Sequence, residues 1–187
     1  AAALAVASLA LWSWPRGSHN LQGKVVLLTG AGGGLGRLLA LHLARRGCVL
    51  ACADVAAEPN EETVALVHQQ QQHKQAARAY TADLTERADI YGLVQKVLED
   101  FGHIDILLSN AGVIQGGALW ELSDAQLDLV LDVNLRATML LVKAVLPHMR
   151  ARAEGHVVAV SSSTALVPGR GIVAYAASKA GLSRAAM

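Results

Sequence analysis

The sequence TGAGGGLG, residues 29–36, places five glycines within eight positions. It follows an apolar run, KVVLLT (24–29), which is short enough to be a strand buried on both faces. It precedes four leucines at helical spacing, Leu35, Leu38, Leu39 and Leu43. Glycine costs roughly 0.5–1 kcal/mol relative to alanine inside regular structure, so the bare backbone must serve a purpose. A strand–glycine–helix junction offers backbone N–H groups and the positive end of a helix dipole, which predicts a pyrophosphate site.

Further strands and helices alternate along the chain. CVLACAD (48–54), AARAYTAD (76–83), IDILLSNAG (104–112) and HVVAVSSS (156–163) are typical of strands. Helices are expected from Glu61 to about His73, after Thr85, from Ser123 to about Arg152, and from Ala174 onward. This alternation predicts a parallel sheet with helices on both faces, and right-handed crossovers make it a doubly wound α/β sheet of the Rossmann type. In such sheets, ligands bind at the carboxyl ends of the strands.

Local patterns indicate where the helices begin and end. Thr85 is expected to cap a helix that carries an apolar stripe, Ile90, Val94, Val97, Leu98 and Phe101. Ser123 and Gln126 form a capping box at the start of the long helix, and Pro147 is expected to kink that helix or split off its last turn.

The long helix carries a polar residue on its apolar side. Asn134 shares a face with the stripe Leu127, Leu131, Leu135, Thr138 and Val142, flanked by Val130 and Leu141. A buried amide without partners would cost about 1–3 kcal/mol, so Asn134 must be hydrogen-bonded, to backbone alone or to water on a proton path.

Composition limits the class of protein. The 187 residues suit one domain; 53% are hydrophobic, 17% are charged, and the formal net charge is +1. No cluster of lysine and arginine lines one face, so no nucleic-acid partner is expected. Cys48 and Cys52 have no histidine or further cysteine at metal spacing, so we expect buried thiols in a reducing compartment and no metal site.

Residues 1–20 form an apolar N-terminal segment, distinct from the domain expected over 21–187. Its first fourteen residues carry no charge, and Trp12, Trp14 and Arg16 suit a membrane interface. Fourteen is short of the roughly 20 residues that a span takes, so we expect the remnant of a membrane anchor. A cleaved signal peptide is the alternative, although it would have a basic leading region. PRGSH (15–19) also resembles a tag remnant.

Asp54 ends the strand after the glycine stretch. Its distance from Gly30 is close to the 20 or so residues at which a carboxylate binds the adenosine ribose in dinucleotide-binding folds. Its charge would repel a 2′-phosphate, and no arginine or lysine stands in the glycine stretch or directly after Asp54. The sequence therefore favours NAD over NADP.

A second cluster carries proton chemistry. Tyr175 and Lys179, in YAASK (175–179), lie four residues apart and so share a helix face. An ammonium about 5 Å from a phenol, at an effective dielectric of about 20, favours the phenolate by roughly 3 kcal/mol. Ser162 ends the fifth strand, and its hydroxyl could hold a substrate oxygen beside the phenol. Such a tyrosine–lysine pair is more often an ordinary surface pair, so the serine is what makes it informative.

Together these motifs resemble the short-chain dehydrogenase/reductase family. The matching elements are TGAGGGLG, Asp54, ADL (82–84), SNAG (109–112), Asn134, the serine strand end and YAASK. NEETVALV (60–67) and KAVLPHM (143–149) are similar to its membrane-associated group, which includes retinol and 17-beta-hydroxysteroid dehydrogenases. Ser109 stands where the family more often has asparagine.

The resemblance implies a role for each matching residue. Tyr175 would be the acid/base, Ser162 would orient the carbonyl or hydroxyl, Lys179 would favour the phenolate and contact the nicotinamide ribose, and Asn134 would complete the catalytic set. The dinucleotide would be lined by Gly30, Gly34, Leu35, Gly36, Asp54, Asp83, Leu84, Asn110, Ala111, Gly112, Tyr175 and Lys179.

The family also implies a reaction and a setting. The reaction is reversible hydride transfer between NAD and a lipophilic alcohol or carbonyl, such as a retinoid or steroid. We expect a homodimer on the endoplasmic reticulum membrane or a lipid droplet, with the catalytic domain facing the cytosol.

The chain stops at Met187, whereas family members continue past this point, so we expect a C-terminally truncated sheet that is poorly active alone. One alternative is a dinucleotide-binding or lipid-droplet scaffold without activity. Another is a soluble NADPH-dependent carbonyl reductase, against which Asp54 and the apolar N-terminus count.

Overall fold

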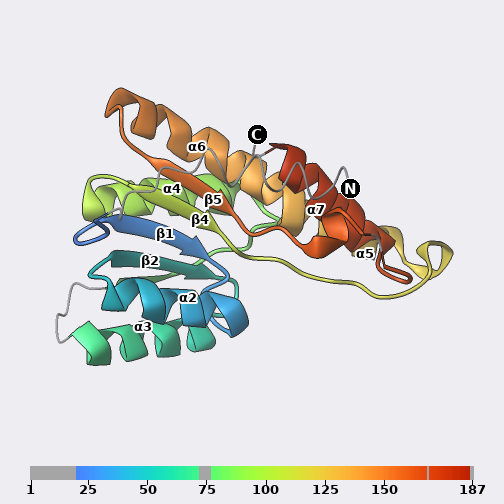
Figure 1. Cartoon of the computed structure of the whole chain (residues 1–187), viewed down its shortest axis with the longest axis horizontal. Helices are drawn as coiled ribbons and strands as arrows, with labels where there is room; N and C mark the ends of the chain where they lie inside the picture. Colours follow the sequence, from blue (N-terminus) through green and yellow to red (C-terminus); the bar gives the residue numbers. More distant parts are fainter. Residues whose placement is uncertain (1–19, 72–76, 168, 186–187) are drawn as a thin grey trace, which may run out of the picture.

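The computed structural model describes residues 20–71, 77–167 and 169–185. Its strands are β1 (Val25–Thr29), β2 (Val49–Asp54), β3 (Ala77–Thr81), β4 (Ile106–Ser109) and β5 (His156–Ala159). They pair in parallel in the order β3-β2-β1-β4-β5 (Figure 1). The predicted doubly wound parallel sheet is therefore confirmed, and the chain reverses its direction of travel across the sheet between β1 and β4.

Helices cover both faces of this sheet (Figure 1). α2 (Gly34–Arg45) and α3 (Ala57–Gln71) lie on one face, and α4 (Arg87–Phe101) and α6 (Ala137–Ala151) lie on the other. α5 (Asp124–Leu131) leads into α6 through a π-helical turn, η2 (Asp132–Arg136). α7 (Val173–Ala185) packs against α5 and η2. The remaining elements are two short 3₁₀ turns, η1 (Leu119–Glu121) and η3 (Ser163–Ala165).

Strand β1 divides its side chains between two hydrophobic cores. Leu27 belongs to the core under α4 and α6, whereas Val26 and Leu28 belong to the core under α2 and α3. All three are fully buried. Since successive strand residues point to opposite faces, a strand covered on both sides has to be apolar throughout, as KVVLLT is.

Helix α2 buries only part of the leucine pattern that its sequence shows, because Leu39 and Leu43 are half-buried against the core and the other two leucines are exposed. Leu35 and Leu38 are 53% and 65% exposed, and the buried face consists of Gly36, Ala40 and Ala44, four residues apart. The small side chains let the helix axis approach the sheet closely, which leucines at the same positions would prevent. The leucines therefore take the sides of the helix.

The limits of two helices differ from the prediction. α3 begins at Ala57, ahead of the predicted Glu61, and the predicted end at His73 lies outside the described residues. α4 begins at Arg87 with Glu86 as its N-cap, and Thr85 caps nothing. Thr85 instead donates its backbone N–H and its hydroxyl to Asp83 Oδ1, at 2.8 Å each, so a local turn replaces the cap. The predicted apolar face of α4 is confirmed, because Ile90, Val94 and Val97 are buried.

The long helical segment is interrupted at a different point from the one predicted. The capping box is confirmed, because Ser123 Oγ accepts from Gln126 N and Gln126 Oε1 accepts from Ser123 N. Pro147 does not split off a last turn, since α6 continues to Ala151, and the change in helical type lies earlier, at η2. Its wider turn also shifts the buried face, so that Leu131 is 41% exposed while Val130, Asn134 and Leu141 are buried.

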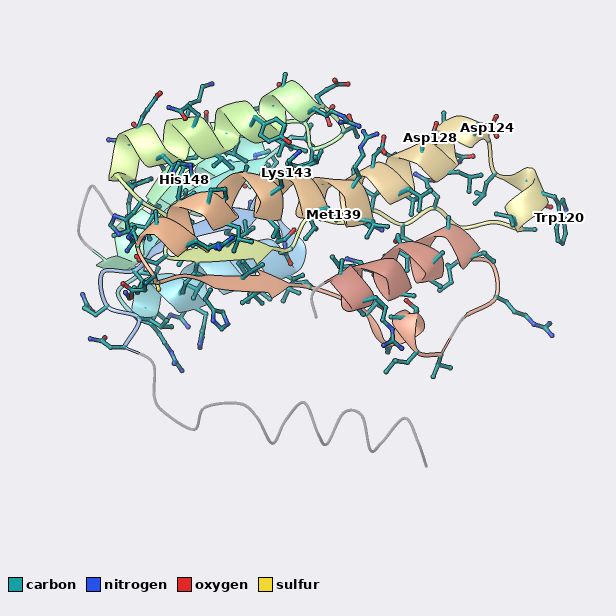
Figure 2. The ribbon with its side chains drawn as sticks, turned by 90° about the horizontal axis from the view of Figure 1, so that it is seen from above. Trp120, Asp124, Asp128, Met139, Lys143 and His148 are labelled. Atoms are coloured by element: carbon teal, nitrogen blue, oxygen red, sulfur yellow. The ribbon has the colours of Figure 1, made fainter. Side chains whose placement is uncertain are left out.

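Seen from above, α6 lies over the sheet with Lys143 and His148, whereas α5 extends beyond it with Asp124 and Asp128 (Figure 2). Trp120, on η1, marks the far end and is 87% exposed. Over residues 20–71, 77–167 and 169–185, no helix combines the length and apolarity that crossing a membrane requires. The predicted membrane-anchor remnant lies outside the described residues, apart from Asn20.

Candidate active site

A cavity of about 470 Å³ opens at the carboxyl ends of the strands, where the chain reverses its direction across the sheet. The glycine stretch, Asp54, the segment after β4, the end of β5 and α7 surround it. Its lining comprises Gly30, Gly33, Gly34, Leu35, Gly36, Asp54, Asn110, Ala111, Gly112, Val113, Ile114, Val160, Ser161, Tyr175 and Lys179. Doubly wound sheets bind ligands at this place.

Two glycines of the stretch 29–36, one in the loop after β1 and one in α2, are required by the geometry. Gly30 has a φ of +68°, and a Cβ there would lie 2.8 Å from Ala111 Cα. A Cβ on Gly36 would lie 1.8 Å from the carbonyl oxygen of Gly30, which leaves no room for any side chain. Gly33, the N-cap of α2, provides no capping side chain. The first N–H groups of a helix have no partner within it, so these groups border the cavity uncapped.

Asp54 stands at the end of β2 on the rim of the cavity. Its Oδ2 accepts a hydrogen bond of 2.8 Å from Gly32 N, and its Oδ1 accepts one of 3.0 Å from Ala56 N. These bonds fix the carboxylate without neutralising its charge. A negative charge therefore borders the glycine loop, as the sequence predicts.

Asn110 links the first strand to the fourth. Its side-chain Nδ2 donates to the carbonyl oxygens of Thr29 (3.0 Å) and Gly30 (3.2 Å). In the other direction, Thr29 Oγ1 accepts from the backbone N–H groups of Asn110 and Ala111, at 3.1 Å each. Both donor hydrogens of the Asn110 amide are used within the protein, so this side chain shapes the cavity wall.

Tyr175 and Lys179 meet on one face of α7, as their spacing predicts. Lys179 Nζ lies 5.8 Å from the centre of the Tyr175 ring and donates a 2.8 Å hydrogen bond to the carbonyl of Val160. Lys179 is only 3% exposed, and its burial lowers the pKa of the ammonium from the ordinary value of 10.5. A buried cation at a cavity wall is costly, which is typical of functional sites.

Asn134 lies in the π-helical turn and is fully buried. Its Oδ1 accepts from Val113 N, and its Nδ2 donates to Val113 O, both at 2.8 Å. Nδ2 also donates to Ser178 Oγ at 3.1 Å, and Ser178 in turn donates to the carbonyl of Tyr175. The predicted hydrogen bonding of a core-facing amide is confirmed, and it joins the segment after β4 to α7.

Ser162 follows β5 but lies outside the lining of the cavity, where its neighbour Ser161 stands. Ser162 Oγ accepts hydrogen bonds from the backbone N–H of Thr164 (3.2 Å) and from its hydroxyl (2.9 Å). In both bonds Ser162 is the acceptor, so its own hydroxyl hydrogen remains available to another oxygen.

Two predicted dinucleotide residues also lie outside this cavity. Leu84 is 9% exposed and packs in the core under α4. Asp83 Oδ1 accepts from Thr85, and Asp83 N donates to Asp89 Oδ2 at 2.9 Å. The structure therefore brings together the glycine loop, Asp54, the 110–112 segment, Tyr175 and Lys179, without Asp83, Leu84 and Ser162.

Sequence reasoning missed several residues at the site. Ser178 supports both Asn134 and Tyr175, and Ile114 lines the cavity although it is 56% exposed. Arg37, directly after the glycine stretch, donates to Gly32 O at 2.8 Å. Its position directly after TGAGGGLG was the only signal in the sequence. Its acceptors lie on α3 and in the loop after β1, and these two segments meet only in the folded chain.

The fold and this cavity agree with the comparison to known proteins. The chain belongs to the short chain dehydrogenase family, whose model matches residues 24–187. It is 43% identical over 162 residues to mouse (Mus musculus) epidermal retinol dehydrogenase 2, covering 86% of this chain and 51% of that protein. It is 35% identical over 199 residues to retinol dehydrogenase 10-B of Xenopus laevis, covering 95% and 58%. The chain thus spans about half the length of these relatives.

Solved structures show the same likeness. NAD⁺-bound xylitol dehydrogenase matches with a TM-score of 0.83 and 31% identity, over 88% of this chain and 63% of that one. A metagenomic short-chain oxidoreductase in complex with NADP matches with a TM-score of 0.84 and 31% identity, over 89% and 74%. The resemblance stated from the motifs is therefore confirmed at the level of the family.

The residues present fit a nicotinamide dinucleotide. The bare backbone of Gly33 and Gly34 leaves the space beside the N-terminus of α2 open, since a Cβ on either would meet nothing within 4 Å. That space adjoins uncapped N–H groups suited to phosphate, and a carboxylate at the end of β2 suited to ribose hydroxyls.

Proposed function

We propose that this chain supplies the dinucleotide site and the catalytic side chains of an oxidoreductase acting on lipophilic alcohols or carbonyls, such as retinoids or steroids. The observation that carries the proposal is the convergence of Tyr175 and buried Lys179 with the glycine loop on one cavity. Membership of the family and the likeness to retinol dehydrogenases support the reaction and the substrate class.

NAD is the proposed cofactor. Asp54 holds a negative charge at the end of β2, where it would repel a 2′-phosphate and accept hydrogen bonds from ribose hydroxyls. Arg37, directly after the glycine stretch, is turned to acceptors on α3 and to Gly32 O, with Glu62 as its ion-pair partner at 3.0 Å. The guanidinium of Arg37 is therefore already engaged and does not offset the Coulomb repulsion from Asp54.

A bound nicotinamide would supply the hydride acceptor or donor for the substrate carbon. The proton is handled by Tyr175, which takes it from a substrate hydroxyl as the phenolate in oxidation and returns it as the phenol in reduction. Ser162 accepts in both of its hydrogen bonds, so its hydroxyl hydrogen can be donated to the substrate oxygen and orient it. Lys179 places a cation 5.8 Å from the centre of the Tyr175 ring.

Asn134 has a place beside the proton path. A Cβ added to Gly112 would lie 3.2 Å from Asn134 Oδ1 and 3.3 Å from Lys179 Nζ, so both groups border this glycine. The Oδ1 atom accepts one hydrogen bond, from Val113 N, and keeps a second lone pair. We assign Asn134 the role of holding a water that exchanges protons with Lys179.

The proposed setting is a membrane or lipid-droplet surface facing the cytosol, reached through residues 1–20, with two copies forming a dimer. An apolar alcohol partitions into a lipid phase, so an enzyme held at that surface meets a higher substrate concentration. Fractionation of cells that express the chain with and without residues 1–20 tests this setting. Recovery of both forms in the soluble fraction would contradict it.

Cofactor titration with and without an alcohol tests the enzymatic proposal. The chain is titrated with NADH and NADPH by cofactor fluorescence, then mixed with NAD⁺ and retinol in detergent micelles while reduced cofactor is followed. NADH binding with at most slow formation of retinal is the expected result, because we expect the chain to be poorly active alone. NADH binding without turnover of retinol or a steroid alcohol favours the scaffold, and no binding of either cofactor removes the proposal.

A further inference from the structure

Two consecutive peptide groups of the loop after β1, Ala31–Gly32 and Gly32–Gly33, are held by side chains. The carbonyl of the Ala31–Gly32 peptide accepts from Thr63 Oγ1 at 2.9 Å, and the N–H of the same peptide donates to Asp54 Oδ2 at 2.8 Å. The carbonyl of the next peptide, Gly32–Gly33, accepts from Arg37 Nη2 at 2.8 Å. The orientation of the first peptide is thereby fixed at both ends.

The second peptide is held at its carbonyl alone. In a planar trans peptide the C=O and N–H point in opposite directions, so fixing Gly32 O toward Arg37 aims the N–H of Gly33 the other way. Gly33 lines the cavity, whereas Ala31 and Gly32 do not. The direction in which Arg37 holds the carbonyl therefore sets the direction in which an anion-binding N–H is presented.

Arg37 itself is fixed by several further contacts on α3. Its Nε donates to Thr63 Oγ1 at 2.9 Å, and its Nη2 donates to Pro59 O at 2.9 Å and pairs with Glu62 Oε2 at 3.0 Å. Thr63 is fully buried and also lies 3.1 Å from Pro59 O. Arg37 and Thr63 thus form one rigid unit between the start of α3 and the loop.

We propose that Arg37 and Thr63 are positioning residues for the pyrophosphate of the dinucleotide. Neither lines the cavity. Arg37 holds Gly32 O outward, so that the N–H of Gly33 and not a carbonyl oxygen faces the phosphates. Thr63 accepts from Arg37 Nε and so keeps the guanidinium in place, and it holds Ala31 O outward as well. A carbonyl rotated into the cavity would oppose an anion by its negative dipole end. This inference rests on the proposed dinucleotide site and adds the residues that orient it.

The test compares ligands that contain a pyrophosphate with one that does not. NADH binding to the chain is measured by cofactor fluorescence, and bound NADH is then displaced with ADP or with adenosine. If Arg37 and Thr63 only joined α2 to α3, their substitution would lower the affinities for ADP and adenosine equally. If they position the loop, substitution lowers the affinity for ADP and leaves the affinity for adenosine unchanged, because only ADP binds the loop N–H groups.

Matched variants separate the hydroxyl from the side-chain volume. Thr63→Val keeps the shape and removes the hydroxyl, and Thr63→Ser keeps the hydroxyl. We expect Thr63→Val to lower the affinities for ADP and NADH about tenfold, equivalent to about 1.4 kcal/mol. Its affinity for adenosine should stay within about twofold of that of wild type. Thr63→Ser is expected to restore wild-type binding. Equal losses for ADP and adenosine, or full ADP affinity in Thr63→Val, would overturn the proposal.

A second pair tests the guanidinium. Arg37→Met keeps the apolar stem, and Arg78→Met removes an arginine that pairs with Asp100 and stacks on Phe101 away from the loop. Arg37→Met is expected to lose ADP affinity by about tenfold or more, and Arg78→Met to lose none. If Arg37→Met fails to fold, the Thr63 pair decides. Wild-type chain that binds no NADH instead refutes the dinucleotide site itself, which is a separate outcome.

Discussion

Lys179 Nζ lies 5.8 Å from the centre of the Tyr175 ring while donating to the carbonyl of Val160 at 2.8 Å. The ammonium thus connects α7, which carries both side chains, to the end of β5. Its distance from the ring is set by a backbone atom and not by the flexible lysine stem. The geometry of the proposed proton-transfer group therefore depends on how α7 docks on the sheet.

Removal of the phenol oxygen should separate binding from chemistry. Tyr175→Phe is expected to lower turnover of a lipophilic alcohol by about 10²–10⁴-fold, the usual contribution of a positioned acid or base. Its affinity for NADH should stay close to that of wild type. Tyr91→Phe, on the 40% exposed tyrosine of α4, is the control and should change neither quantity. Equal turnover by the two variants would remove Tyr175 from the mechanism.

The buried ammonium of Lys179 should lower the stability of the folded chain. Its folded-state pKa lies below the ordinary 10.5 because of burial, so at a pH near or above the folded-state pKa the unfolded chain binds more protons than the folded chain. Relative to Lys179→Met, the wild-type chain should therefore gain stability as pH rises toward 10.5. Urea unfolding of both proteins at neutral and alkaline pH measures this. A stability difference independent of pH would contradict it, and exposed Lys143→Met serves as control.

The charge of Asp54 should decide between the two cofactors. Asp54→Asn keeps an acceptor for Gly32 N and removes the charge that would repel a 2′-phosphate. We expect the affinity for NADPH relative to NADH to rise about tenfold, or about 1.4 kcal/mol. Glu61→Gln removes an exposed charge from α3 and should leave the ratio unchanged. If wild type already prefers NADPH and Asp54→Asn does not alter the ratio, NAD is the wrong assignment.

Neighbouring glycines should respond very differently to a methyl group. Gly36→Ala places a Cβ 1.8 Å from Gly30 O, so α2 must move away from the loop, and overpacking of this kind costs about 1–3 kcal/mol or more. Gly33→Ala meets nothing within 4 Å and has an extended φ of −166°. Thermal unfolding should show a lower Tm for Gly36→Ala alone. Similar Tm values for both variants would show that the close approach does not exist.

Asp105 should make the chain sensitive to acid. Burial alone would raise the pKa of this carboxyl, but the hydrogen bonds from Arg152 and Val25 N hold it below the ordinary 3.8. A lowered folded-state pKa contributes stability above about pH 4 and loses it as pH falls through the folded value. Asp105→Asn should lose about 1–3 kcal/mol at neutral pH, and the loss should shrink in acid. A constant loss across that range of pH would exclude this linkage.

Local patterns predicted the parts of the fold whose causes are local. The KVVLLT strand, the glycine loop and the capping box at Ser123 depend on neighbours in sequence, and each was correct. The buried face of α2 could not be predicted in this way, because how close the helix lies to the sheet decides that Gly36 and not Leu38 faces inward. Thr85 does not cap α4, because its hydroxyl and its backbone N–H both donate to Asp83 Oδ1.

The site was predictable to the extent that its residues follow strands or share a helix face. Asp54, Asn110 and the pair Tyr175 and Lys179 therefore reach one cavity as expected. Asp83 and Leu84 follow a strand too, but β3 is the strand at the sheet edge farther from the crossover point. The Asp83 side chain binds Thr85, and the Leu84 side chain packs in the core. The contacts of Arg37 with α3 arise from tertiary packing and left no pattern in the sequence.

The π-helical turn at Asp132–Arg136 has a consequence for insertions and deletions in this part of the chain. A π turn holds one residue more than an α-helical turn, so it works as a built-in insertion in the middle of a helix. Deleting that residue would straighten the segment into a single α-helix and rotate everything on one side of it by about 100°. Either Asn134 would then lose its hydrogen bonds to Val113 and Ser178, or the buried face of α6 would no longer point toward the sheet. The number of residues in the segment from α5 to α6 is therefore constrained by this one turn.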